Sequence, residues 1–176
     1  MVLKVVTIID NLNHIFMKRI IITIISVLGF CTMASSQEAT ISDVWLEHNV
    51  SKSTGYYNQS VKGMEIHVTL EVDDLRQQKV SVAAYFAYHD GDDYVTLKTR
   101  YNTQYRSIPD NSVCTWTEVY PKYDSTYWED FVLFIPYSEI SRALPESASM
   151  ACCVSVFYDN DLLAMSDMVE FEFTKN

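Results

Sequence analysis

Acidic side chains gather in the predicted turns of this sequence, and they are the residues best suited to bind an ion. Asp90, Asp92 and Asp93 follow one extended segment, and Asp159 and Asp161 follow another. If successive strands alternate in direction, these turns meet at one end of the fold and supply the six to eight oxygen ligands that Ca²⁺ takes. Asp also occupies turns for backbone reasons alone. The sequence therefore leaves two interpretations, a calcium site on converging loops or solvated turn residues.

Residue types used in catalysis do not form a recognised pattern. His67 lies between Glu65 and Thr69 on the polar side of one segment, which favours a solvated or ion-paired histidine. Glu47 and Glu129 are carboxylates that a glycosidase pair would use, but any acidic protein offers such pairs. The chain has no nucleophile elbow, zinc-protease helix motif, Walker loop or dinucleotide fingerprint. We therefore expect a binding protein and not an enzyme.

Aromatic side chains lie in or beside several predicted loops, and they are candidates for ligand contact: Tyr56, Tyr57, Tyr123, Tyr127 and Trp128. Exposed Tyr and Trp offer flat, amphipathic surface to sugars or to protein partners. Strand surfaces and cores also use Tyr freely. The pattern predicts a glycan or protein partner, with a structural role as the alternative.

Cysteine use is compatible with an oxidising compartment but does not require it. Cys114, Cys152 and Cys153 follow the N-terminal region. One disulfide from Cys114 to Cys152, or to its neighbour, is one expectation. Three buried thiols acting as small apolar residues are the other. The spacing does not match a structural zinc site.

The composition is that of a folded, acidic domain. Of 176 residues, 48% are hydrophobic and 20% are charged, and the formal net charge is -10. The sequence pI is about 4.7. Lysine and arginine do not cluster after residue 19, which argues against nucleic acid or anionic membranes as partners.

Residues 17–36 are typical of a secretory signal peptide. A short positive region, Met17-Lys18-Arg19, precedes the apolar run Ile20 to Cys31, and small residues precede a cleavage position before Gln37. The run is shorter than the roughly 20 residues that span a bilayer, so we expect no transmembrane segment after cleavage. The mature chain would be a single domain over residues 37–176, secreted, periplasmic or on the outer surface.

Two features of the N-terminus leave alternatives open. Residues 1–16 are an unusual preamble to a signal peptide, which favours translation from Met17 over Met1. Lipidation at Cys31 competes with plain cleavage, although Phe30 is bulkier than the small residue that a lipobox has before its cysteine.

Alternating apolar and polar residues predict the fold. The clearest case is Gly63 to Val72, where Met64, Ile66 and Val68 fall on one face and Glu65 and His67 on the other. Further extended segments are expected at 39–48, 79–89, 94–106, 112–120, 128–135, 150–158 and a last one ending at 173. A short helix is expected over 138–144, with Ser138 as its N-cap. These elements predict an all-β, immunoglobulin-like antiparallel β-sandwich of seven or eight strands with one short helix, and a closed barrel is the alternative.

Several motifs together resemble a small all-β module of Bacteroidota proteins. They are Val44 to Asn49, Gly63 to Val68, Val82 to Phe86, Glu129-Asp130, and Phe134 to Glu139. The module is similar to a secreted or C-terminally appended domain, and the resemblance covers most of residues 40–173. It implies a sandwich and a location at the cell envelope, and it supplies no activity and no catalytic residues.

The tripeptide Asp124-Ser125-Thr126 resembles the short site that Bacteroidota O-glycosylate. It predicts a glycan on Ser125, which intact-mass measurement of native protein would reveal. The sequence as a whole predicts an exported, non-enzymatic binding or interaction module without a required cofactor. A calcium-dependent carbohydrate-binding module is the alternative.

Overall fold

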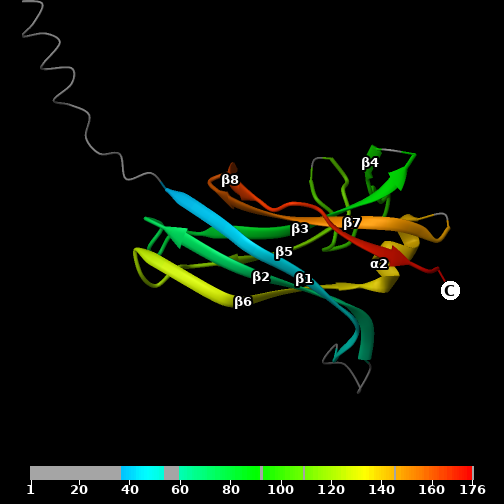
Figure 1. The fold of residues 1–176 in the computed structure, drawn as a ribbon, viewed down its shortest axis with the longest axis horizontal. Helices are drawn as coiled ribbons and strands as arrows, with labels where there is room; N and C mark the ends of the chain where they lie inside the picture. Colours follow the sequence, from blue (N-terminus) through cyan, green and yellow to red (C-terminus); the bar gives the residue numbers. More distant parts are fainter. Residues whose placement is uncertain (1–36, 54–59, 92, 109, 145, 176) are drawn as a thin grey trace, which may run out of the picture. The chain divides into compact units, whose positions relative to one another are not determined.

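The structure is a computed structural model that describes residues 37–53, 60–91, 93–108, 110–144 and 146–175. These residues belong to the compact unit Gln37–Asn176. Its elements are β1 (Glu38–Ser53), β2 (Ser60–Asp73), β3 (Val80–Asp90), β4 (Asp93–Thr96), β5 (Cys114–Val119), β6 (Ser125–Pro136), α2 (Tyr137–Ala143), β7 (Ala148–Tyr158), β8 (Asp161–Met165) and β9 (Val169–Phe173) (Figure 1). The predicted signal peptide, with Cys31, lies outside the described residues.

The smaller sheet, sheet A, has three antiparallel strands in the order β1-β2-β6. The central strand, β2, contains the regular alternation found in the sequence. Val68 of β2 lies opposite Val44 of β1 and Phe131 of β6, so the three strands turn apolar side chains to the same side. Glu65 and His67 face the other side, which is the outer face of sheet A.

The larger sheet, sheet B, is centred on β3 and β7, and each of its edges consists of two short segments. β5 pairs with the first half of β3 and β4 with the second half. On the other edge, β8 and β9 share β7 in the same way. The predicted last strand is thus split in two, which accounts for nine strand segments where the sequence predicts seven or eight.

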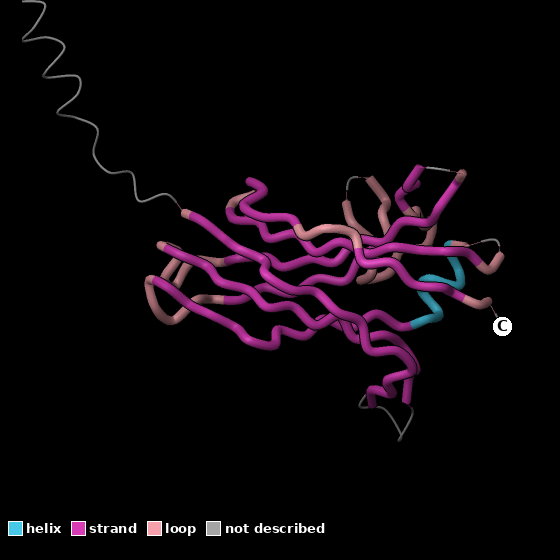
Figure 2. Tube along the Cα trace, in the orientation of Figure 1, coloured by secondary structure: helices cyan, strands magenta, loops and turns pink. Residues whose placement is uncertain are grey.

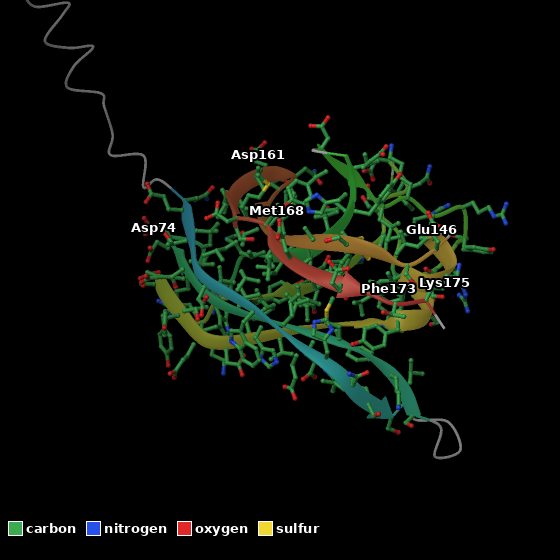
Figure 3. All side chains as sticks on the ribbon, turned by 45° about the vertical axis from the view of Figure 1, so that its right-hand side comes forward. Asp74, Glu146, Asp161, Met168, Phe173 and Lys175 are labelled. Atoms are coloured by element: carbon green, nitrogen blue, oxygen red, sulfur yellow. The ribbon has the colours of Figure 1, made fainter. Side chains whose placement is uncertain are left out.

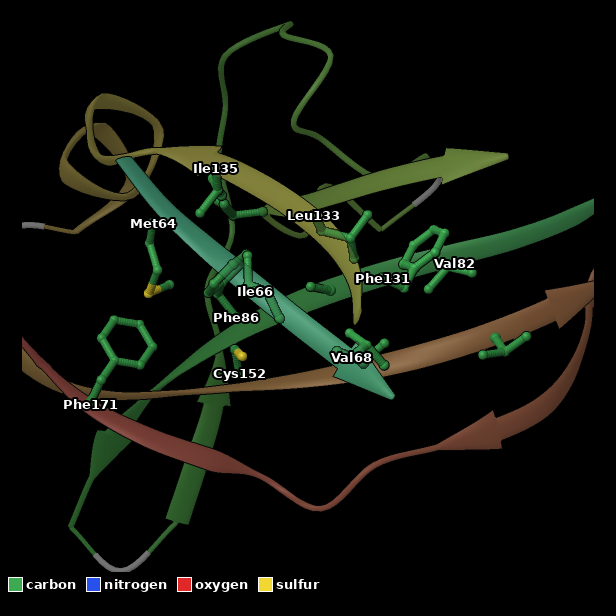
Figure 4. Packing of buried hydrophobic residues seen from close by; sticks show 14 of the residues in the cluster. Met64, Ile66, Val68, Val82, Phe86, Phe131, Leu133, Ile135, Cys152 and Phe171 are labelled. Atoms are coloured by element: carbon green, nitrogen blue, oxygen red, sulfur yellow. The ribbon is translucent and has the colours of Figure 1, made fainter. Parts of the chain in front are cut away.

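Apolar side chains from both sheets meet in one core, shown in Figure 4. Ile66 of β2 and Leu133 of β6 come from sheet A, while Phe86 of β3 and Cys152 of β7 come from sheet B. All four are at most 3% exposed. Full burial of a Leu, Ile or Phe side chain contributes about 1.5–3 kcal/mol. The predicted all-β antiparallel sandwich is therefore confirmed, with two sheets packed face to face.

The predicted short helix is also present, but it begins differently. α2 starts at Tyr137, its N-cap is Pro136, and no side chain caps it, so the expectation for Ser138 is wrong. The helix ends at Ala143, and the N–H of its C-cap, Leu144, donates to the Ile140 carbonyl at 3.0 Å.

The segment predicted as a strand over 94–106 is mostly a folded-back loop (Figure 2). Asp93–Thr96 pairs with β3, and the N–H of the next residue, Leu97, donates to the Phe86 carbonyl of β3 at 2.8 Å. Beyond it the chain turns on itself, and the N–H of Cys114 donates to the Tyr105 carbonyl at 2.9 Å. Local hydrogen bonds thus replace the ladder that an extended segment would need.

β1 and β2 are longer than predicted. The sequence predicts extended segments over 39–48 and from Gly63 onward, but pairing continues between them to Ser53 opposite Ser60. Asn49, at φ 62°, is an extra residue in β1 that lets the ladder continue past it. Within the described part of the chain, no helix is long and apolar enough to cross a membrane.

Candidate functional site

The outer face of sheet B carries a groove of about 810 Å³. Its floor comes from β3, β5 and β7, and a wall is formed by four residues of the long loop, Arg106, Ser107, Ile108 and Asp110. It is lined by Lys79, Ser81, Ala83, Tyr85, Arg106, Ser107, Ile108, Asp110, Cys114, Trp116, Glu118, Phe157, Asp159 and Asn160. This volume falls within the range of about 300–1,000 Å³ typical of small-ligand sites.

Strand pairing decides which side chains face the groove. Trp116 of β5 lies directly opposite Ala83 of β3, and Glu118 lies opposite Ser81. Because β3 turns Val82 and its apolar neighbours to the core, its odd-numbered residues and their partners on β5 face outward. Thr115 faces inward, where its hydroxyl donates to the carbonyl oxygen of Phe134 at 2.8 Å.

Aromatic rings form the apolar part of the groove. Trp116 is 50% exposed, and the small side chain of Ala83 beside it leaves room for a ligand next to the indole. Tyr85 and Phe157 meet edge to face with ring centroids 6.5 Å apart. The three rings offer flat apolar surface that does not belong to the core.

The rim of the groove is polar and carries charges of both signs. Lys79 and Glu118 form an ion pair at 3.0 Å, and the hydrogen bond to Glu118 raises the pKa of Lys79. Burial alone would raise the pKa of Asp110, but hydrogen bonds from Ser112 and Ser107 outweigh it and leave that pKa below its usual value. Asp110 is therefore an ionised acceptor at neutral pH.

Arg106 adds a positive charge on the loop side of the groove. Its Nη2 donates to Asn102 at 3.2 Å, while its buried Nε has no hydrogen-bond partner among the described residues. A buried N–H without a partner is costly, so this part of the loop wall is not at its most stable.

The aromatic residues singled out in the sequence do not form this groove. Tyr56 and Tyr57 lie outside the described residues. Tyr123 and Tyr127 are exposed, at 68% and 60%, beside the start of β6. Trp128 is half-buried, packs on the core and meets the Phe131 ring edge to face at 6.0 Å, and its part in ligand contact stays a prediction.

The acidic turns do not converge. Val80 lies opposite Tyr158 and Tyr88 opposite Met150, so the Asp159–Asp161 turn lies at the start of β3, and Asp90 and Asp93 lie at its end. Ten residues of strand separate the two turns by about 33 Å. Figure 3 shows Asp161 toward the end of the domain where Asp74 lies, away from Glu146. The shared calcium site is therefore wrong for these four residues, and Asp92 lies outside the described residues.

The predicted Cys114–Cys152 disulfide is also wrong. Cys114 and Cys153 both lie opposite Tyr85, on the two strands that flank β3, which puts them about 9.5 Å apart. Cys152 faces the core on the other side of the sheet. A disulfide needs Cα atoms within about 7 Å. The alternative expectation, three buried thiols, is confirmed.

Thiol labelling would test this arrangement. Burial raises the pKa of Cys114 from 9.0 to about 11 and that of Cys152 from 9.0 to about 12. At neutral pH the higher pKa alone lowers the thiolate fraction of Cys114 about 100-fold, and the thiolate is the reactive form. We expect peptides carrying Cys114 and Cys152 to be labelled by iodoacetamide at least 100-fold more slowly in native protein than in urea, with the native rate rising toward pH 11. Rapid native labelling, or a disulfide-linked peptide on a non-reducing mass map, would contradict this.

Ser125 lies exposed at the first position of β6, and its hydroxyl donates to Glu71 at 3.0 Å. Its glycosylation stays a prediction.

Sequence reasoning missed two parts of the groove, the Trp116 side chain and the loop wall around Asp110. Trp116 alternates with Cys114 and could be assigned to either face of a strand. Only its pairing with Ala83 shows that the indole faces outward. Asp110 reaches the groove through a loop whose course no local pattern records.

Comparison with known proteins gives little guidance. No protein-family model matches the chain. No curated protein matches it either. A crystal structure from Akkermansia muciniphila is similar at 13% sequence identity, with a TM-score of 0.40, over 76% of this chain and 70% of that chain. What the protein binds must therefore be inferred from its own residues.

Proposed function

We propose that the protein is an exported, non-enzymatic binding module that holds a neutral oligosaccharide in the groove of sheet B. The observation that carries the proposal is the half-exposed indole of Trp116 beside Ala83, inside a groove with a polar rim. An exposed Trp in such a setting binds the apolar face of a sugar ring, while the rim groups bind its hydroxyls.

Charge favours a neutral ligand over an acidic one. The chain has a formal net charge of -10, which repels polyanions at long range. Within the groove, Lys79 is already paired with Glu118, and Asp110 is ionised. Hydroxyl groups can donate to these carboxylates and accept from Arg106, whereas a second anion would be repelled.

Export is supported by the sequence of residues 17–36 and by the resemblance to an envelope module of Bacteroidota proteins. Calcium has no part in the proposal, because the described acidic turns lie at opposite ends of sheet B. We therefore expect glycan binding to persist in EDTA.

A glycan array followed by calorimetry tests the proposal. Trp116→Ala is expected to weaken binding of an array-selected neutral oligosaccharide by about 30-fold or more, the effect of losing about 2 kcal/mol at an aromatic hot spot. Stability should change little, because the indole is outside the core. Tyr127→Ala is the matched control, since this exposed ring lies on β6 of the other sheet.

Two results would overturn the proposal. One is an array without a neutral glycan that binds. The other is a glycan whose affinity drops with Tyr127→Ala and not with Trp116→Ala, which would place the site among the tyrosines near the start of β6.

A further inference from the structure

The outer face of sheet A holds an unfavourable arrangement of negative charge. Glu47 of β1 lies directly opposite Glu65 of β2 in the strand register. Like charges in directly opposed positions destabilise a sheet. Lys52 neutralises part of this charge, with its Nζ 2.7 Å from Oε1 of Glu65. The other oxygen of Glu65 is turned toward His67, as is a carboxylate oxygen of Glu47.

His67 is buried between these groups, and a hydrogen bond is present at one of its ring nitrogens but not at the other. It is 6% exposed, and its Nδ1 lies 2.6 Å from Oδ1 of Asp130. Because an ionised carboxylate can only accept, Nδ1 carries a hydrogen, and Nε2 is the nitrogen that can offer a lone pair to an ion. Nε2 is buried and has no hydrogen-bond partner among the residues that the structure describes. It faces Oε2 of Glu47 at 3.6 Å and Oε2 of Glu65 at 3.7 Å.

Two features of the fold hold the imidazole in this position. Val68 pairs with Phe131 and Leu70 with Trp128, so β6 has one residue more than β2 over this stretch. Asp130 lies in this bulge, and bulges commonly re-aim side chains. On the other side, the Trp45 ring stacks on the His67 imidazole, with ring centroids 3.6 Å apart and an angle of 6° between the ring planes. This stacking shields the imidazole from water.

We propose that this cluster is a binding site for a divalent transition-metal ion such as Zn²⁺. The ligands are Nε2 of His67 and one carboxylate oxygen each from Glu47 and Glu65, and these three atoms lie within 4.8 Å of one another. Two ligands about 2.1 Å from a tetrahedral metal are roughly 3.4 Å apart, close to the separations seen here. Asp130 is a positioning residue, because a carboxylate on the second nitrogen fixes the orientation and tautomer of a ligating histidine.

The donor set also indicates the class of metal. An imidazole nitrogen with two carboxylates suits zinc and its neighbours, whereas calcium prefers six to eight oxygens. The ion would neutralise both glutamates and give Nε2 its missing partner. Three protein ligands leave a coordination position for water or a ligand atom. A proton on Nε2 is the competing occupant of the same space.

Zinc titration of the full chain tests the proposal, with zinc alone as the probe. After removal of metals with EDTA, we expect calorimetry and metal analysis to give one Zn²⁺ per chain. Glu47→Gln should weaken binding at least 100-fold, since losing a ligand costs no less than the 10–100-fold that loss of an outer-shell partner costs. Glu71→Gln is the matched control. Glu71 lies on the same face of β2, four residues and about 13 Å from His67. Zinc should raise the melting temperature of the wild type and of the control, but not that of Glu47→Gln.

Asp130→Asn provides a second variant with a different readout. We expect zinc affinity to drop 10–100-fold, with nitrogen NMR of His67 showing mixed tautomers in the metal-free protein. Zinc bound equally well by wild type and Glu47→Gln would overturn the proposal. A His67 ring that keeps both N–H hydrogens in the presence of zinc would do the same and would assign the position to a proton. Trp116→Ala should leave zinc affinity unchanged, so this test is independent of the proposed groove.

Discussion

Replacing Gly63 by alanine is expected to destabilise the domain by about 3 kcal/mol or more, the upper range for overpacking. A β-carbon at this position would lie 2.5 Å from a ring carbon of Phe134 and closer still to the carbonyl oxygen of Ile135. The carbonyl belongs to the β2–β6 ladder and cannot move without breaking pairing. The gain from a less flexible unfolded chain is only about 0.4–1 kcal/mol and does not offset the clash.

Urea unfolding measures this change, and Gly91→Ala is its control. Gly91 has φ 71° in the turn after β3, with open space where a β-carbon would lie. Its substitution costs only the left-handed backbone penalty of roughly 1–2 kcal/mol. Equal losses for the two variants would show that the close approach of β6 to Gly63 does not exist.

Local alternation made the strands predictable, and its absence explains the failures. Met64, Ile66 and Val68 form an apolar face within β2 itself, so this strand can be recognised without knowing its neighbours. The loop after β4 has tyrosines at spacings that also suit a strand, such as Tyr101 and Tyr105. Its actual course depends on the hydrogen bond between Tyr105 and Cys114, which is a tertiary contact that no local pattern encodes.

The candidate sites depend on register, which the sequence does not record. That Glu65 and His67 share a face follows from their spacing of two. That Glu47 lies opposite Glu65 depends on how β1 aligns with β2, and that Asp130 reaches His67 depends on how β6 aligns with β2. The prediction that the acidic turns converge was wrong for the same reason, because the two hairpins of sheet B place Asp90 and Asp159 at opposite ends of the sheet.

The sandwich separates the two proposed sites. The groove lies on the outer face of sheet B and the His67 cluster on the outer face of sheet A, with the core between them. Because they share no side chains, variants in one should combine additively with variants in the other. Trp116→Ala combined with Glu47→Gln should therefore show the sum of the single changes in both glycan and zinc affinity.

A pair of phenylalanine variants on sheet B tests which of its faces is the core. Phe86 of β3 is 1% exposed and points toward sheet A, as Figure 4 shows. Its replacement by alanine should lower the free energy of unfolding by about 3–5 kcal/mol, since lost burial is joined by a cavity that rigid strands cannot close. This is a large part of the roughly 5–15 kcal/mol that stabilises a typical domain, so unfolding should begin at much lower urea.

Phe157→Ala removes the same atoms from the opposite face of the sheet. Its ring is half-buried in the groove, where it contacts Tyr85 edge to face. Loss of that contact should cost roughly 0.5–1.5 kcal/mol of stability, while weakening whatever the groove binds. Because the deleted group is identical, any difference between the two variants reports the face and not the residue type. A Phe157→Ala protein as unstable as Phe86→Ala would mean that the outer face of sheet B is covered and that the groove is not a ligand site.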